Sequence, residues 1–211
     1  MKKIIYFSLV LFLCLTAIHS TAEAADSDKL ILLPEARIIS QTGEVGVKIS
    51  SEQNKVMGAV KLTEWLQVGA EMTPDQDDNN FIPTAKVLII NEYNYGLDLA
   101  AGLEDDNLYI SSRKTFGKGI KGHLGLGQEE MGGLFIGVSK VITPNSIQIS
   151  EKKKVDSNKK SRSLMPPLKL SAEYVDQNIN LGVVARLNNS LNVSLSLLDL
   201  EDFTAGLSYS F

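Results

Sequence analysis

An alternation of apolar and polar side chains with a period of two runs from Gly43 to Phe211, and it constrains the fold more than any other feature of this sequence. Successive side chains of a β-strand point to opposite faces, so the alternation predicts strands with one apolar and one polar face. The pattern is clearest at the end of the chain. There it continues unbroken through Phe203, Thr204, Ala205, Gly206, Leu207, Ser208, Tyr209, Ser210 and Phe211.

Twelve segments alternate in this way, with an irregular stretch at Leu88 and Ile90. With their flanking residues, these segments approach the length of a tilted membrane strand, which is about 9–11 residues. An even number of antiparallel strands can close without an open edge, as in bacterial outer-membrane barrels. We therefore predict an all-β fold, a transmembrane antiparallel up-and-down β-barrel. The segments centre on residues 45–49, 56–62, 66–72, 85–89, 95–103, 108–113, 120–126, 134–138, 168–174, 179–187, 191–197 and 203–211.

A water-soluble sandwich also alternates, and the N-terminal sequence helps to separate the two folds. Residues 1–3 are basic at Lys2 and Lys3, residues 4–18 are mainly apolar, and residues 22–24 form a small-x-small site. This is the pattern of a secretory signal peptide. The apolar run is shorter than the about 20 residues of a transmembrane helix. We therefore expect residues 1–24 to be cleaved on export.

The C-terminal residues point to the same compartment. Leu207, Tyr209 and Phe211 alternate with serines and resemble the aromatic signal by which outer-membrane barrels are inserted. Together with the signal peptide, they predict a barrel in the outer membrane of a Gram-negative bacterium. The expected partners are the lipids of that membrane and the barrel-assembly machinery.

The mature chain divides into a short leading segment and one barrel. We expect residues 25–42 to form an N-terminal periplasmic segment and residues 43–211 to form the barrel, interrupted by a long basic loop at 141–166. Strand parity puts this loop on the periplasmic side, where barrels usually keep their turns short. Its Lys-rich part, residues 151–162, has the composition of a solvated loop or of a binding site for a periplasmic partner.

Composition argues against several kinds of chemistry. Cys14 is the only cysteine and lies in the predicted signal peptide, so the mature chain is expected to have no thiol chemistry and no disulfide. The signal peptide holds two lysines and one glutamate, which leaves 19 basic and 24 acidic residues and a net charge of −5. Such a charge argues against binding of nucleic acid. No cofactor or metal site is expected.

Catalysis also finds little support in the sequence. After loss of His19, His123 is the only histidine that could serve as a base for a nucleophile. No serine stands near it in a recognisable pattern. His123 lies on the polar face of its segment, where a hydrogen bond in the lumen is the simpler interpretation. The chain is therefore expected not to be an enzyme.

The polar faces of the segments define a candidate lumen. Seven basic and three acidic residues face it, together with His123, which gives a predicted net charge of +4. An open lumen of this charge would favour anions. A narrow one would be closed by ion pairs and hydrogen bonds, which is the interpretation we favour. The candidate lumen residues are Lys48, Lys61, Glu71, Lys86, Asp98, Arg113, Lys121, His123, Lys169, Glu173 and Arg186.

Several short motifs, taken in order, resemble the YjbH-like outer-membrane proteins that are linked to exopolysaccharide production. They include a Pro-Glu-Ala-Arg start at residues 34–37, a Trp-Leu strand around Trp65, Ala-Gly-Leu at residues 101–103, and Arg-Lys-Thr-Phe-Gly at residues 113–117. The resemblance covers roughly residues 33–138. It implies a role in exopolysaccharide assembly or export. Because the predicted lumen is net positive and many exported glycans are anionic, we expect an acidic polysaccharide as a partner. The alternatives are a small general pore, a structural outer-membrane barrel, and an outer-membrane lipid or glycan enzyme.

Overall fold

The computed structural model describes residue 31 and residues 34–51, 53–74, 80–117, 119–128, 133–142 and 166–211. The predicted signal peptide, residues 1–24, and the Lys-rich stretch 151–162 lie outside the described residues. Most of the predicted basic loop 141–166 also lies outside the described residues, but Val141 and Ile142 belong to a strand.

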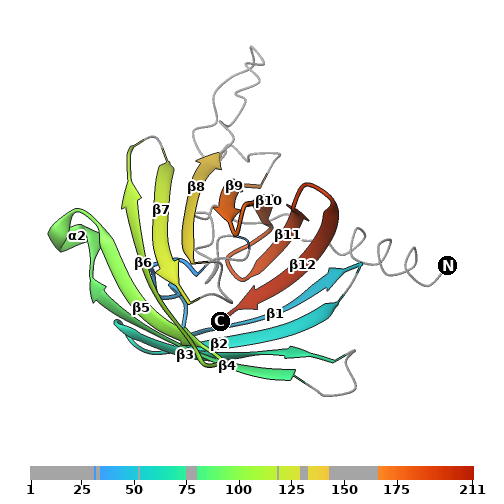
Figure 1. Ribbon diagram of the computed structural model, residues 1–211, viewed down its shortest axis with the longest axis horizontal. Coiled ribbons are helices and arrows are strands. Elements are labelled where there is room, and N and C mark those ends of the chain that lie inside the picture. Colours follow the sequence, from blue (N-terminus) through green and yellow to red (C-terminus); the bar gives the residue numbers. More distant parts are fainter. Residues whose placement is uncertain are drawn as a thin grey trace, which may run out of the picture.

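Twelve strands follow one another along the chain, and each pairs antiparallel with its neighbours. The last strand also pairs with the first, so the sheet closes into a barrel (Figure 1). The predicted fold class is therefore confirmed. The strands are β1 (Gly43–Ser50), β2 (Asn54–Thr63), β3 (Leu66–Thr73), β4 (Asn80–Ile90), β5 (Asp98–Glu104), β6 (Asn107–Thr115), β7 (Ile120–Gly127), β8 (Leu134–Ile142), β9 (Leu168–Val175), β10 (Asn178–Arg186), β11 (Leu191–Leu198) and β12 (Asp202–Ser210).

The period-two pattern divides the side chains between the two surfaces of the wall. Val47 lies on the outer surface, beside Val56 of β2 and Leu207 of β12. Ser139 lies on the inner surface and is buried beside the buried Ser171 of β9. In the described residues, most buried side chains are polar or charged, and many large apolar side chains are exposed. This arrangement is the reverse of a water-soluble sandwich, whose polar face looks outward.

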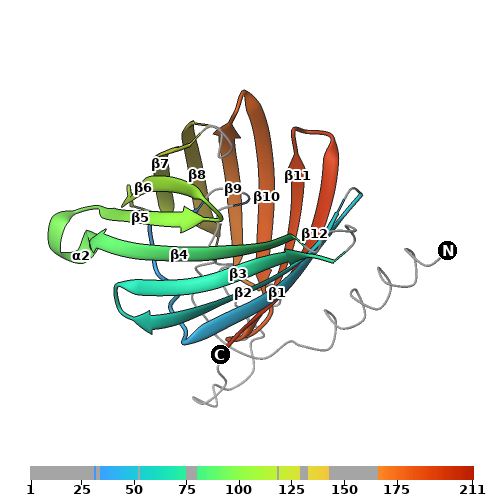
Figure 2. The same cartoon turned by 60° about the horizontal axis from the view of Figure 1, so that its bottom comes forward.

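Connections between successive strands lie alternately at the two ends of the barrel (Figure 2). We call the end where β1 begins and β12 stops the terminal end, and the opposite one the far end. Two hairpins at the far end turn tightly: Asp176 and Gln177 both have positive φ, as do Asp199 and Leu200. Asp176 and Gln177 alone connect β9 to β10, and two successive positive φ values are those of the type I′ turn that suits the twist of a two-residue hairpin.

The fifth segment was predicted to begin at Tyr95, but residues Glu92–Tyr95 form a short helix, α2, and β5 starts only at Asp98. Asn91 caps this helix, since its side chain accepts a hydrogen bond from the Tyr93 N–H at 2.8 Å. Gly96 ends it in the left-handed conformation, with φ of 79°. No helix among the described residues is long and apolar enough to cross a membrane.

The irregular alternation at Leu88 and Ile90 has a structural cause. The register between β4 and β5 shifts between these two residues, as at a β-bulge. A bulge places an extra residue in one strand and so changes which side chains share a face.

Candidate functional site: the barrel lumen

The structure places all eleven candidate lumen residues on the inner surface of the wall. Lys48, Lys61, Lys121 and Arg186 are half-buried, and each is paired across the sheet with a buried residue. The other seven are buried: Glu71, Lys86, Asp98, Arg113, His123, Lys169 and Glu173.

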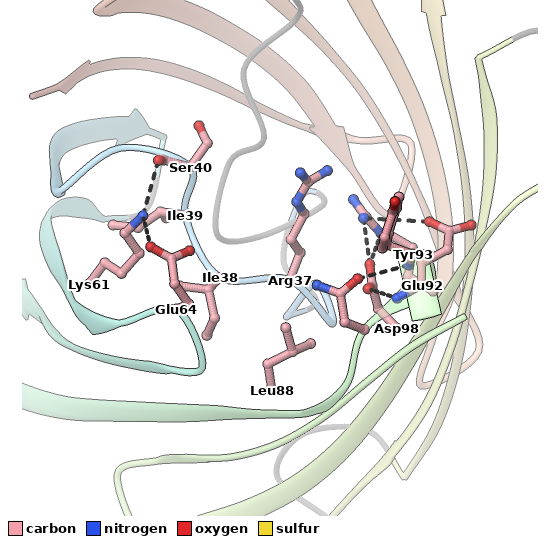
Figure 3. Close-up of a pocket in the computed structure, with 12 residues that line it drawn as sticks. Arg37, Ile38, Ile39, Ser40, Lys61, Glu64, Leu88, Glu92, Tyr93 and Asp98 are labelled. Atoms are coloured by element: carbon pink, nitrogen blue, oxygen red, sulfur yellow. Dashed lines mark hydrogen bonds and ion pairs between the residues drawn. The ribbon is translucent and has the colours of Figure 1, made fainter. Parts of the chain in front are cut away.

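A part of the chain that sequence analysis assigned to the periplasm also lies inside the barrel. We call Ile31 and residues Pro34–Thr42 the lumen segment. Several buried apolar side chains belong to it, among them those of Ile31, Ala36, Ile38 and Ile39. The segment runs without strand structure through the space enclosed by the wall (Figure 3). It had no periodicity from which this position could be predicted.

Lysines of the wall hold the backbone of the lumen segment. Lys48 on β1 donates to the carbonyl oxygen of Ile31 at 3.0 Å. Lys86 on β4 donates to the carbonyl oxygen of Glu35 at 3.2 Å, and Lys61 on β2 donates to that of Ser40 at 3.3 Å. The contacts at Ile31 and Glu35 satisfy peptide oxygens that would otherwise be costly to enclose away from water, whereas the contact at Ser40 is exposed.

Gln67 of β3 binds the same segment from a further strand. Its side-chain oxygen accepts a hydrogen bond from the backbone N–H of Ile39 at 3.0 Å, and the side chain is 2% exposed. Gln67 is not among the candidate lumen residues chosen from the sequence, which are charged residues and one histidine.

Glu35 is the centre of the charged part of the lumen. Its side chain is 1% exposed and forms an ion pair with Lys169 of β9. Its second carboxylate oxygen lies 3.8 Å from Nη1 of Arg113, on β6. Because Lys86 binds the Glu35 carbonyl oxygen, cations from three strands meet at this one residue. Five of the seven predicted lumen cations thus contact the lumen segment.

Arg113 joins Glu35 to a second acidic group. Its Nε and Nη2 atoms donate to Oδ2 of Asp98 at 3.0 and 2.5 Å, a charge-assisted contact through two donors. Glu92 of α2 lies 3.8 Å from the same guanidinium. Asp98 in turn accepts the backbone N–H of Glu92 at 2.6 Å, so α2 is tied to the wall.

The predicted net charge of +4 therefore omitted acids that the structure brings into the lumen. Glu35 and Glu92 both lie within ion-pair distance of Arg113, yet neither stands on a strand. Counting the charged residues on the polar faces of the strands leaves out side chains that enter the lumen from outside the strands. The described lumen consequently contains a network of ion pairs and hydrogen bonds, the arrangement favoured for a narrow barrel.

A pocket of about 490 Å³ lies between the lumen segment and the wall (Figure 3). Its charged lining is balanced, with Arg37, Lys61 and Arg113 against Glu64, Glu92 and Asp98. Asn91, Glu92 and Tyr93 belong to the connection between β4 and β5, so the pocket lies toward the terminal end.

His123 has a serine neighbour that the sequence did not reveal. Its Nε2 atom lies 3.0 Å from Oγ of Ser139 on the adjacent strand β8. Among the described residues, no group forms a hydrogen bond with its Nδ1 atom. A catalytic histidine is usually oriented by such a third group. The contact therefore fits a structural hydrogen bond better than a nucleophile and its base.

No group of three or more metal-binding side chains occurs in the part of the chain that the structure describes. The arrangement of the lumen is thus one of cations, carboxylates and amides. The basic side chains of the lumen bind oxygen atoms, both of peptide carbonyls and of a carboxylate.

No protein-family model and no curated protein matches this sequence. Among solved structures, a KdgM porin aligns with 80% of this chain and 98% of its own, at 11% identity and a TM-score of 0.50. A KdgM porin in complex with disordered oligogalacturonate aligns over the same shares, at 10% identity and a TM-score of 0.47. The outer membrane protein Omp33 of Acinetobacter baumannii aligns with 81% of this chain and 98% of its own, at 6% identity and a TM-score of 0.43. The first likeness shows a shared barrel fold.

Proposed function

We propose that this chain is a bacterial outer-membrane barrel whose lumen binds and passes acidic saccharides, in the assembly or export of an exopolysaccharide. One observation carries the proposal. Cations on five strands, β1, β2, β4, β6 and β9, bind the carbonyl and carboxylate oxygens of one non-helical, non-strand segment inside the barrel. An acidic saccharide offers the same chemistry, since it is an extended chain with many oxygen atoms and regularly spaced carboxylates.

The outer surface supports insertion in a membrane. Large aromatic side chains are exposed near both ends of the wall, a position that suits the polar boundaries of a bilayer. Phe81, Tyr174 and Phe203 lie near the far end, and Trp65, Phe116, Tyr209 and Phe211 lie near the terminal end. The belt between them is formed by exposed aliphatic side chains, such as those of Val47, Leu124 and Ile136.

The sequence resemblance to YjbH-like proteins favours a glycan over other anions. It also links the proposed passage to exopolysaccharide production. A non-enzymatic role accords with the hydrogen bond between His123 and Ser139, which has the form of a structural contact.

Planar-bilayer recordings of the purified barrel test this function. We expect a small anion-selective conductance that a uronic acid oligomer reduces and a neutral oligosaccharide of equal length does not. Replacing Lys61 and Lys121 with methionine should lower the anion selectivity, because both lysines face the lumen. Lys140→Met is the matched control, since this lysine is exposed on the outer surface. Equal effects of uronic and neutral oligomers would contradict the proposal.

A permanently closed structural barrel is the second candidate. The extent of the lumen network favours it, because the lumen segment contacts at least six of the strands. Under this alternative, the barrel conducts no ions and binds no saccharide under any condition.

A further inference from the structure

We infer that Lys169 and Arg113 form a binding site for the carboxylate of an acidic sugar, and that Glu35 is a built-in occupant that the sugar must displace. The inference rests on the proposed function and names its substrate contact. In this inference the lumen segment competes with the sugar for the same site and is not a fixed part of the barrel wall.

The geometry around Glu35 is that of a bound carboxylate. One oxygen is paired with the Lys169 ammonium, and the other faces the Arg113 guanidinium at 3.8 Å. All three side chains are at most 3% exposed, so the charges interact in a poorly hydrated space. Asp98 fixes Arg113 through Nε and Nη2, which leaves Nη1 directed at Glu35.

The site can be reached from the terminal end. Arg113 belongs both to the carboxylate site and to the lining of the 490 Å³ pocket. That volume falls in the range of small-molecule sites, which is about 300–1,000 Å³. Four residues of the lumen segment, Arg37–Ser40, also line the pocket. A sugar in the pocket therefore touches the guanidinium and the segment that it must replace.

The other contacts of the lumen segment are of a kind that a sugar can replace. Lys48, Lys61 and Lys86 bind peptide carbonyl oxygens, and hydroxyl or ring oxygens of a saccharide accept the same hydrogen bonds. The segment continues directly into β1 at Gly43 and so stays attached after displacement. When a site is partly filled by its own chain, the apparent affinity for a ligand falls by the fraction of molecules in which the site is vacant.

Titration calorimetry with a trimer of uronic acid tests the competition. Glu35→Gln keeps the size of the side chain but removes the competing charge, so we expect at least about tenfold tighter binding of the trimer. Glu173→Gln is the matched control, because it removes the same charge from another buried side chain of the lumen. The Glu173 carboxylate accepts a hydrogen bond from Asn180. We expect the affinity of this control variant for the trimer to stay within about twofold of the native value, and a neutral trisaccharide to gain nothing from Glu35→Gln.

The cations are tested in the Glu35→Gln background. Lys169→Met and Arg113→Met should each return the affinity to the native value or weaken it further. A heat-dependent shift in gel mobility shows that each variant has folded, and only folded variants are compared. Unchanged binding in both would overturn the assignment of these two side chains.

A disulfide lock tests displacement with Glu35 intact. A Cβ atom on residue 182 would lie 2.9 Å from Cγ1 of Ile31, close to the roughly 3 Å between Cβ and the opposite sulfur of a disulfide. The Ile31→Cys, Gly182→Cys variant should form this bond and hold the segment in the lumen. We expect the oxidised form to lose binding of the uronic acid trimer and its effect on conductance, and reduction to restore both.

The outcomes separate the inference from the proposed function. If the native barrel binds the trimer but Glu35→Gln and the lock change nothing, the inference is wrong and the function stands. If no form of the barrel binds the trimer or conducts anions, both are wrong.

Discussion

Gly43 and Phe211 close the barrel by donating a backbone hydrogen bond to each other, at 2.9 Å in both directions. The aromatic ring of Phe211 lies directly over Gly43, where a Cβ atom would come within 2.7 Å of its Cε2. The Tyr209 ring lies 6.5 Å away, centroid to centroid. The last residue of the chain therefore completes the pairing of β1 with β12 and adds to the exposed aromatic side chains at the terminal end.

Deleting Phe211 should impair assembly, because it removes both hydrogen bonds to Gly43 and an exposed aromatic ring. The measurement is the fraction of protein that shifts in gel mobility on heating after expression. Phe211→Leu serves as the control, since it keeps the backbone contacts, and should assemble better than the deletion. Normal assembly without Phe211 would contradict its predicted role in insertion.

Gly125 should not tolerate a larger residue, because the buried ring of Phe135 occupies the space above it. Gly125→Ala forces that ring out of place, and such overpacking costs about 1–3 kcal/mol of stability. Gly58→Ala is the control, because its Cβ atom would meet nothing closer than 3.8 Å. Urea unfolding, followed by fluorescence of the single tryptophan, compares the two. Equal midpoints would refute this packing argument.

The alternation predicted the strands because period two is a direct consequence of strand geometry. It failed at Tyr95, where local hydrogen bonds decide the structure: Asn91 caps a helical turn and Gly96 ends it. Both cap residues can be seen in the sequence. The strand was nevertheless predicted to begin at Tyr95, because apolar residues stand at every second position from there.

Only those residues of the site that stand on strands of the barrel wall could be predicted from the sequence. Lys86, Arg113 and Lys169 follow from strand parity, since each alternates with outward neighbours. Glu35 does not, because residues 34–42 have no strand pattern and the contact between Glu35 and Lys169 spans 134 positions. The sequence motif at residues 34–37 marked the segment only through the YjbH-like resemblance. The ion pairing of a non-periodic segment depends on tertiary structure, which periodicity does not encode.

The buried pair of Asp98 and Arg113 should be strongly coupled. Asp98→Asn leaves a buried guanidinium without a contact made at 2.5 Å, and breaking such a pair from one side costs about 3–5 kcal/mol. Adding Arg113→Met should recover part of that loss, which a double-mutant cycle of unfolding free energies measures. Lys61 and Glu64 form the control pair, because the Glu64 side chain is 90% exposed and such contacts contribute at most about 1 kcal/mol. A coupling no larger than in this control pair would show that Asp98 contributes little.

His123 should matter for stability and not for catalysis. His123→Ala removes the contact to Ser139, and we expect a loss of about 1 kcal/mol, the contribution of one hydrogen bond. Ser139→Ala should cost a similar amount, and the double variant should cost less than the sum because both remove one contact. Unfolding curves give the three values, and assays with phospholipid and glycan esters test for hydrolysis. An ester hydrolysis that disappears in folded His123→Ala would establish an enzyme instead.

Trp65 offers a direct test of membrane insertion, because it is the only tryptophan of the chain and its side chain is 53% exposed on the turn between β2 and β3. If the terminal end lies at a bilayer boundary, lipids brominated near their headgroups should quench its fluorescence more than lipids brominated near the chain ends. Moving the tryptophan to position 81, as Phe81→Trp with Trp65→Phe, should give the same result at the far end. Val47 lies in the middle of β1 on the outer surface, so Val47→Trp with Trp65→Phe should show the opposite order. The three positions together define a belt with two boundaries, which adsorption to a membrane surface cannot produce. A water-like emission without quenching at all three would refute the membrane barrel.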